Sequence, residues 1–160
     1  MSDQDRPPVA GRIRLARTAL GIEPGVAAAR LGLNFESYAD LEWFDDEAFT
    51  TLSLTEVLSL AEMLHVSVAE LLTTDDNTPR TDAVSMAALM KTLRTWIQEE
   101  EMTIQSFGDR IGWDIANAVA NPSSAWNDWN VDCLIEVCNA VGVDWLAILS
   151  SASQRDLMSQ

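Results

Sequence analysis

The fold is decided by residues 13–42, IRLARTALGIEPGVAAARLGLNFESYADLE. A related stretch occurs a second time further along the chain. Residues 93–122 align with this stretch at an offset of 80 residues, and residues 52–72 align with 129–149 at an offset of 77 residues. A repeat of this length is one folding unit used twice. The sequence therefore predicts two related domains in tandem.

Each copy has the apolar spacing of short helices. The pattern predicts a first helix ending at Gly21, helices over 24–31, 35–42 and about 54–64, and a short fifth helix after Ser67. No alternating strand pattern interrupts it, so we expect an all-α fold of two five-helix bundles. Polar residues suited to cap helices stand at the expected starts in both copies: Asn34, Ser53, Ser67, Thr103, Asp114, Asn130 and Asp144.

The predicted domains are separated by a polar, proline-containing segment. We expect the first domain over 9–72, a linker over 73–84 and a second domain over 85–151. Residues 1–8 and 152–160 are predicted to be loose tails.

Composition favours a soluble protein of the cytoplasm. Apolar residues make up 48% of the chain, which is enough for real cores. No run of 18 apolar residues predicts a membrane span, and the first residues lack a signal-peptide pattern. Cys133 and Cys138 lie five apart on one predicted helix, roughly 140° around it, so we expect buried thiols in a reducing compartment.

The chain has no obvious catalytic or metal-binding set. A single histidine and the lack of a Cys-x-x-Cys motif leave a zinc ion without ligands, so no metal or cofactor is expected. No nucleophile–histidine set or phosphate-cradling glycine loop is apparent, which argues against an enzyme. The net charge of −15 is shared: five basic and twelve acidic residues give residues 1–72 a charge of −7.

A short helix, a glycine turn and a capped helix ending in Leu-Glu form a helix-turn-helix arrangement. The first copy resembles the Cro/phage-repressor helix-turn-helix family, through Arg17, Leu31-Gly32, Tyr38, Leu41-Glu42 and the ending LSLTEVLSLAEMLHVSVAELL. The resemblance implies two tandem lambda-repressor-like bundles, the second more degenerate. It also implies a salt bridge between Arg17 and Glu42, expected to contribute about 1 kcal/mol or less as an exposed or half-exposed pair. In the second copy Ile97 and Pro122 replace these partners.

In this family the third helix enters the major groove of DNA. The base-reading positions carried over by resemblance are Phe35, Glu36 and Asp40 in the first copy and Ile115, Ala116 and Ala120 in the second. Carboxylates are disfavoured beside phosphates, and the apolar set offers no hydrogen bonds to bases. Both sets therefore predict that the groove-reading surface has been lost.

Two further groups carry alternative interpretations. Arg12, Arg14 and Arg30 could contact phosphates, or could balance carboxylates in an acidic chain. Trp43 and Trp96 have no large apolar counterpart in the other copy, so they are candidates for an interface within or between chains. The alternative is that both tryptophans cover the local core.

Two functional hypotheses follow. The first is a non-enzymatic regulatory protein that acts through protein contacts, with another protein or with a copy of itself as a homodimer. Its basis is the net charge and the acidic and apolar third helices. The alternative, implied by the resemblance, is a transcription regulator that binds duplex DNA directly through its first domain.

Overall fold

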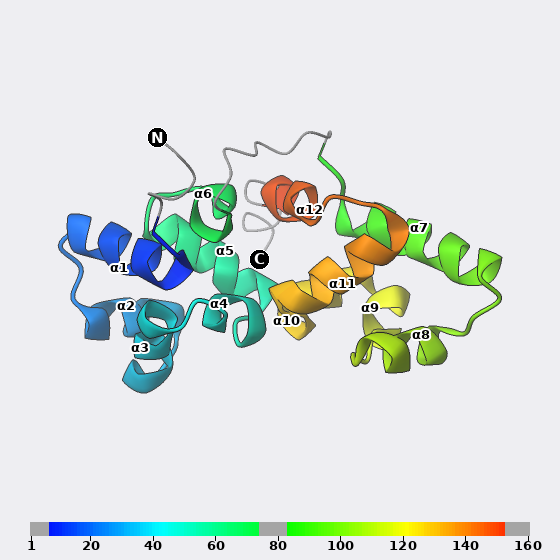
Figure 1. The fold of residues 1–160 in the computed structure, drawn as a ribbon, viewed down its shortest axis with the longest axis horizontal. Helices are drawn as coiled ribbons and strands as arrows, with labels where there is room; N and C mark the ends of the chain where they lie inside the picture. Colours follow the sequence, from blue (N-terminus) through cyan, green and yellow to red (C-terminus); the bar gives the residue numbers. More distant parts are fainter. Residues whose placement is uncertain (1–6, 74–82, 153–160) are drawn as a thin grey trace. The chain divides into compact units, whose positions relative to one another are not determined.

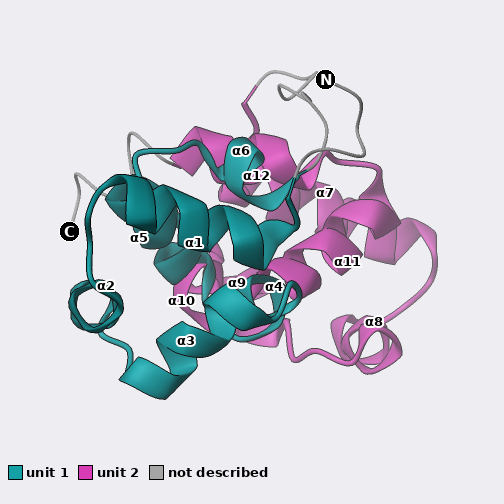
Figure 2. Ribbon diagram, turned by 60° about the vertical axis from the view of Figure 1, so that its left-hand side comes forward, with its two compact units in different colours: residues 1–78 teal, residues 79–160 magenta. Residues whose placement is uncertain are grey.

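The computed structural model describes residues 7–73 and 83–152, and every regular element in these two ranges is a helix. The predicted all-α fold is confirmed there. The predicted linker and both tails lie largely outside the described residues. The chain divides into two compact units, residues 1–78 and 79–160, coloured separately in Figure 2.

Unit 1 contains a series of short helices that follow the predicted order (Figure 1). These are α1 (Val9–Ala19), α2 (Pro24–Leu31), α3 (Phe35–Trp43), α4 (Glu47–Thr50), α5 (Leu54–Met63) and α6 (Val68–Leu72). Helix α1 packs against α3 and α6, and α2 packs against α3 and α5. The core between them includes Ile13, Tyr38, Leu41, Leu54, Leu60 and Leu71.

Local sequence explains the turn that joins α2 to α3. Pro24 stands at the start of α2, where its missing N–H is not needed. Gly32 ends α2 at φ 69°, a left-handed conformation that side chains disfavour. Asn34 then caps α3, its side-chain oxygen accepting a hydrogen bond of 2.7 Å from the Ser37 N–H. These residues set where α3 begins.

Unit 2 has the corresponding helices in the same order. They are α7 (Met86–Glu99), α8 (Ile104–Ile111), α9 (Ala116–Ala120), the 3₁₀-helix η2 (Pro122–Ser124), α10 (Ala125–Asp128), α11 (Val131–Val141) and α12 (Trp145–Ala152). Helix α7 packs against α8, α9, η2 and α11. The core includes Leu89, Leu93, Phe107, Trp129, Cys133, Leu134 and Val137.

The described part of each unit holds six α-helices rather than the predicted five. The additional ones, α4 and α10, have four residues each. One turn of helix carries too few residues to display a helical period, which is why the sequence did not reveal them. None of the helices within 7–73 and 83–152 combines the length and apolar character needed to cross a bilayer.

Candidate functional site

A largely buried ion pair joins α3 to α1 in unit 1. Arg17 on α1 and Glu42 on α3 form two hydrogen bonds, Nε to Oε1 and Nη2 to Oε2, the second at 2.9 Å. The guanidinium also donates to the Ile22 carbonyl at 2.7 Å, and the Tyr38 hydroxyl donates to Glu42 Oε1 at 2.8 Å. These hydrogen bonds hold the Glu42 carboxylate on both of its oxygens. They join α3 to α1 and to the turn that follows α1.

The pair is more enclosed than the exposed or half-exposed pair that the sequence led us to expect. The side chains of Arg17 and Glu42 are only 12% and 8% exposed. The hydrogen bond to Glu42 raises the pKa of Arg17, and burial followed by its hydrogen bond to Glu42 raises the pKa of the Tyr38 phenol. A bidentate, buried pair leaves a desolvated charge when either partner is removed, so its loss costs more than that of a surface pair.

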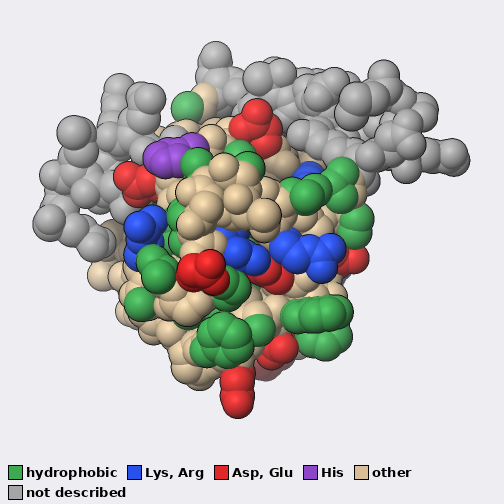
Figure 3. Space-filling model, turned by 90° about the vertical axis from the view of Figure 1, so that its left-hand side faces the viewer, with side chains coloured by type: hydrophobic (Ala, Val, Ile, Leu, Met, Phe, Trp, Pro, Cys, Tyr) green, Lys and Arg blue, Asp and Glu red, His purple; other side chains and the backbone are tan. Residues whose placement is uncertain are grey.

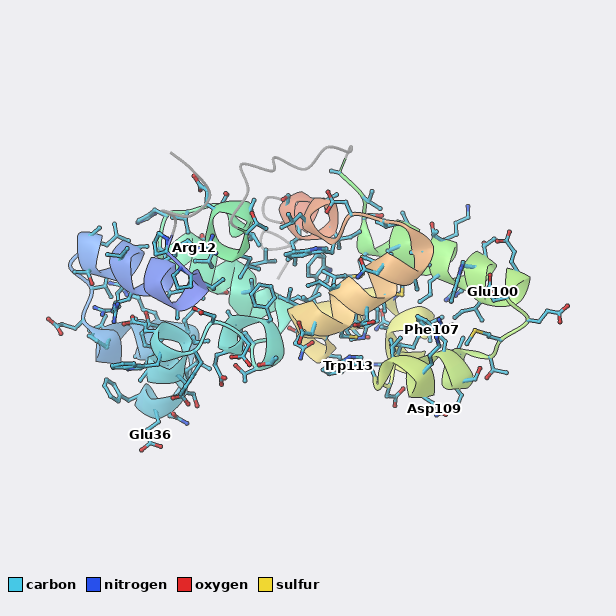
Figure 4. The ribbon with its side chains drawn as sticks, viewed as in Figure 1. Arg12, Glu36, Glu100, Phe107, Asp109 and Trp113 are labelled. Carbon is cyan, nitrogen blue, oxygen red and sulfur yellow. The ribbon has the colours of Figure 1, made fainter. Side chains whose placement is uncertain are left out.

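With its buried side held by this cluster, α3 presents a different set of side chains to solvent. Phe35 is 59% exposed, Trp43 is 73% exposed, and Phe44 just after the helix is 56% exposed. Glu36 is exposed and projects away from the unit in Figure 4, whereas Asp40 is half-buried. We call Phe35, Glu36, Asp40, Trp43 and Phe44 the aromatic–acidic surface. Three of its five residues are the positions where the resemblance predicts base readers.

The turn after α3 extends the acidic character of this region. Asp45 accepts a hydrogen bond of 3.1 Å from the Ala10 N–H in the first turn of α1, which has no side-chain cap of its own. A carboxylate suits a helix N-terminus, because the free N–H groups there carry partial positive charge. Asp46 is exposed and Glu47 is half-buried. Asp45 therefore has a structural role that the sequence did not predict.

The three arginines proposed as phosphate contacts have different surroundings. Arg12 is half-buried, and its Nη1 donates to the backbone carbonyls of Glu70, at 3.0 Å, and Thr73. It therefore joins α1 to the end of α6 through backbone carbonyls. Arg14 and Arg30 are exposed. Their role as phosphate contacts stays a prediction.

In unit 2 the corresponding helix is short and partly buried. Ile115 is only 1% exposed and immediately precedes α9, so it lies in the core and not on a reading surface. Ala116 and Ala120 are exposed. Pro122 forces the preceding residue out of the helical region, which ends α9 after five residues. The structure therefore does not bring the three predicted positions onto one exposed face.

A different set of contacts joins the first and third helices of unit 2. Ile97 is buried in the place of Arg17, and Arg94 Nη2 donates to the Val119 carbonyl on α9. Trp96 is half-buried and packs edge-on against Phe107, with ring centroids 5.2 Å apart and planes at 69° (both in unit 2; Phe107 is labelled in Figure 4). Trp96 thus contributes to packing within its own unit, whereas Trp43 is largely open to solvent.

The remaining candidates for chemistry are buried. Burial raises the pKa of the Cys133 and Cys138 thiols to about 12, with smaller contributions from neighbouring groups. Such thiols stay protonated at neutral pH and are poor nucleophiles. The residues described in both units include no group of three or more His, Cys, Asp or Glu side chains that could hold a metal ion. No protein-family model, curated protein or solved structure matches this chain.

Proposed function

We propose that this chain is a non-enzymatic regulatory protein, built from two degenerate lambda-repressor-like helix-turn-helix bundles, that acts through protein contacts. The helix-turn-helix part of the proposal rests on the sequence repeat, the resemblance of 13–42, and the tie between Arg17 and Glu42. Its non-enzymatic part rests on the single histidine and the absence of a nucleophile–histidine pattern in the sequence.

The single observation that carries the protein-contact proposal is the character of the exposed side of α3. That side presents Phe35, Trp43 and Glu36 to solvent, and the sequence has no Lys or Arg from 31 to 79. A helix that enters a DNA groove brings its exposed side close to phosphates, which repel carboxylates. Aromatic side chains are instead enriched at protein interfaces.

A titration against duplex DNA tests this proposal. The full chain is added to a fluorescently labelled duplex at about 50 mM and about 200 mM salt, and anisotropy is followed. We expect no binding at the lower salt, where attraction to phosphate is strongest. Saturable binding that weakens at the higher salt would contradict the proposal.

Direct DNA binding through unit 1 remains the second candidate because Arg14 and Arg30 are exposed there. Under that function, the double variant Arg14→Ala/Arg30→Ala should lose affinity for duplex DNA and show a smaller salt dependence. Arg12 is left unchanged in this test, because its hydrogen bonds to backbone carbonyls support folding. Equal affinity of the double variant and the parent chain would exclude these arginines as the contacts.

A further inference from the structure

The exposed aromatic side chains are not scattered over the molecule. In the part of the chain that the structure describes, all large apolar side chains that are exposed belong to unit 1: Leu15, Leu20, Val26, Phe35, Trp43 and Phe44. The three aromatic ones lie on α3 or directly after it. Figure 3 faces the α1–α3 end and shows hydrophobic side chains at the surface, with both carboxylates and Lys or Arg side chains among them. Three large aromatic side chains exposed on one short helix and the residue after it, and not the separate aliphatic ones, are the feature that suggests an interaction site.

Helical geometry places the carboxylates beside the aromatic rings. Phe35, Ala39 and Trp43 are four residues apart, so they follow one another along one side of α3, about 12 Å from first to last. Glu36 and Asp40 follow the same spacing, roughly 60–100° further around the helix. An aromatic stripe therefore lies alongside a row of two carboxylates.

We propose that the aromatic–acidic surface binds an arginine-bearing amphipathic segment of a partner protein, an inference that rests on the function proposed above. A guanidinium stacks on the face of Trp43 or Phe35 and can form two parallel hydrogen bonds to a carboxylate. Apolar side chains of the same segment cover the rest of the aromatic stripe. Both halves of this chemistry, the ring and the carboxylate, stand next to each other on α3.

Charge argues for a cationic partner over a second copy of this chain. Residues 1–72 carry a charge of −7, so two copies meeting at this surface bring like charges together. No Lys or Arg occurs from 31 to 79, and the exposed cations of the helices packed on α3 are Arg14 on α1 and Arg30 on α2. Duplex DNA is disfavoured by the same negative charge.

The test uses the full chain and a synthetic peptide of about 15 residues, with leucine on one helical face and arginine on the other. Binding is measured by isothermal titration calorimetry. We expect Trp43→Ala to raise the Kd of the arginine peptide about tenfold or more. The double variant Glu36→Gln/Asp40→Asn should raise it several-fold and reduce its salt dependence.

Matched controls separate this site from general attraction to an acidic protein. Leu15→Ala removes an exposed apolar side chain on α1, and Glu62→Gln removes an exposed charge on α5; both should leave the Kd unchanged. A second peptide with glutamate in place of arginine should not bind. Circular dichroism checks that each variant keeps its helices.

Three outcomes would overturn the inference. These are absence of binding by the arginine peptide, equal loss of affinity in the control and surface variants, and a homodimer by light scattering that Trp43→Ala dissociates while the peptide does not bind. Duplex DNA is titrated in parallel. Retention of DNA would instead contradict the proposed function, whereas loss of peptide binding without DNA binding contradicts only the docking inference.

Discussion

Unit 1 leaves three aromatic side chains on and after α3 open to solvent, whereas unit 2 draws its aromatic side chains inward. Trp129 is 2% exposed, Trp126 is buried, and Trp96 packs on Phe107. The two copies thus differ in whether their aromatic side chains are exposed or are buried and half-buried. We infer that unit 1 meets a partner and that the tryptophans of unit 2 serve its own core.

The two units also differ in how their first and third helices are joined. Unit 1 uses a bidentate ion pair, Arg17 with Glu42, and has a third helix of nine residues. Unit 2 uses buried Ile97 and a hydrogen bond from Arg94 to a backbone carbonyl, and its third helix has five residues. Apolar packing can replace the ion pair, but here it accompanies a shorter helix with less exposed surface.

The largest effect expected from this comparison concerns the tryptophans. Trp129→Ala should lower the free energy of unfolding of unit 2 by about 3–5 kcal/mol, because a large buried side chain leaves a cavity. Trp43→Ala should change the stability of unit 1 by about 0.5 kcal/mol or less, since its side chain is already largely in water. Urea denaturation, with amide hydrogen exchange to separate the units, measures both.

A comparable loss from Trp43→Ala would mean that this side chain supports the core. It would then cease to be a candidate contact, and the contrast between the units would fail.

The ion pair should give the next largest effect. Glu42→Leu leaves Arg17 as a largely buried charge without its carboxylate and removes the acceptor of the Tyr38 hydroxyl, so unit 1 should lose up to about 3 kcal/mol. The double variant Arg17→Met/Glu42→Leu replaces the ion pair with apolar side chains, as the buried Ile97 does in unit 2. It should recover most of the lost stability. Urea denaturation of both variants tests this.

Equal destabilisation in the single and double variants would show that the charge itself is not the cause. In that case the loss would come from the changed shape of the core.

As the pH is raised, unit 2 should begin to lose folding stability at a lower pH than unit 1. Folding raises the pKa of Cys133 and Cys138 from 9.0 to about 12, so the stability that their protonated forms contribute is full below pH 9 and is lost between pH 9 and 12. Each thiol contributes a slope of about 1.4 kcal/mol per pH unit in that window. In unit 1 the raised pKa of Tyr38 has this effect only above pH 10.0.

Hydrogen exchange or urea midpoints across this range provide the measurement. The double variant Cys133→Ala/Cys138→Ala should flatten the decline of unit 2 between pH 9 and 10. A decline that persists in the variant would assign it to other groups.

The smallest expected effect concerns turns where one copy has glycine and the other does not. Glu101 has φ 52°, and the aligned Gly21 has φ 66°; His65 has φ 55° where the other copy has Gly142. Left-handed backbone strains residues with a Cβ, so Glu101→Gly should stabilise unit 2 by about 0.5–1 kcal/mol. Glu100→Gly is the control: its φ of −82° gives no such relief, and it should destabilise. Thermal denaturation should show a higher midpoint for Glu101→Gly and a lower midpoint for Glu100→Gly than for the parent chain.

Much of the fold was accessible from the sequence because its signals are local. Asn34, Ser53, Ser67, Thr103 and Asn130 were predicted to begin helices, and each is an N-cap whose side chain accepts a backbone hydrogen bond. The left-handed turns at Gly32, Gly112 and Gly142 are of the same kind. These features depend only on residues within one turn, so a single sequence contains them.

The candidate site was less accessible because it depends on contacts between distant residues. The bonds from Arg12 to the end of α6 and from the Ala10 N–H to Asp45 join segments 35 or more residues apart, and no local pattern marks them. Ile115 is buried at the N-terminal end of α9, and its position in the aligned sequence did not indicate this. The sequence did single out Trp43, because nothing large aligns with it in the other copy.

The exposure of Trp43 gives this protein a built-in optical reporter. All six tryptophans lie within the described residues, and the other five are buried or half-buried. A collisional quencher such as iodide or acrylamide will therefore reach the Trp43 indole most readily, and its emission should be the most red-shifted of the six. Shielding of this one fluorophore on complex formation can be followed without any label, and Trp43→Phe removes the signal while keeping an aromatic ring.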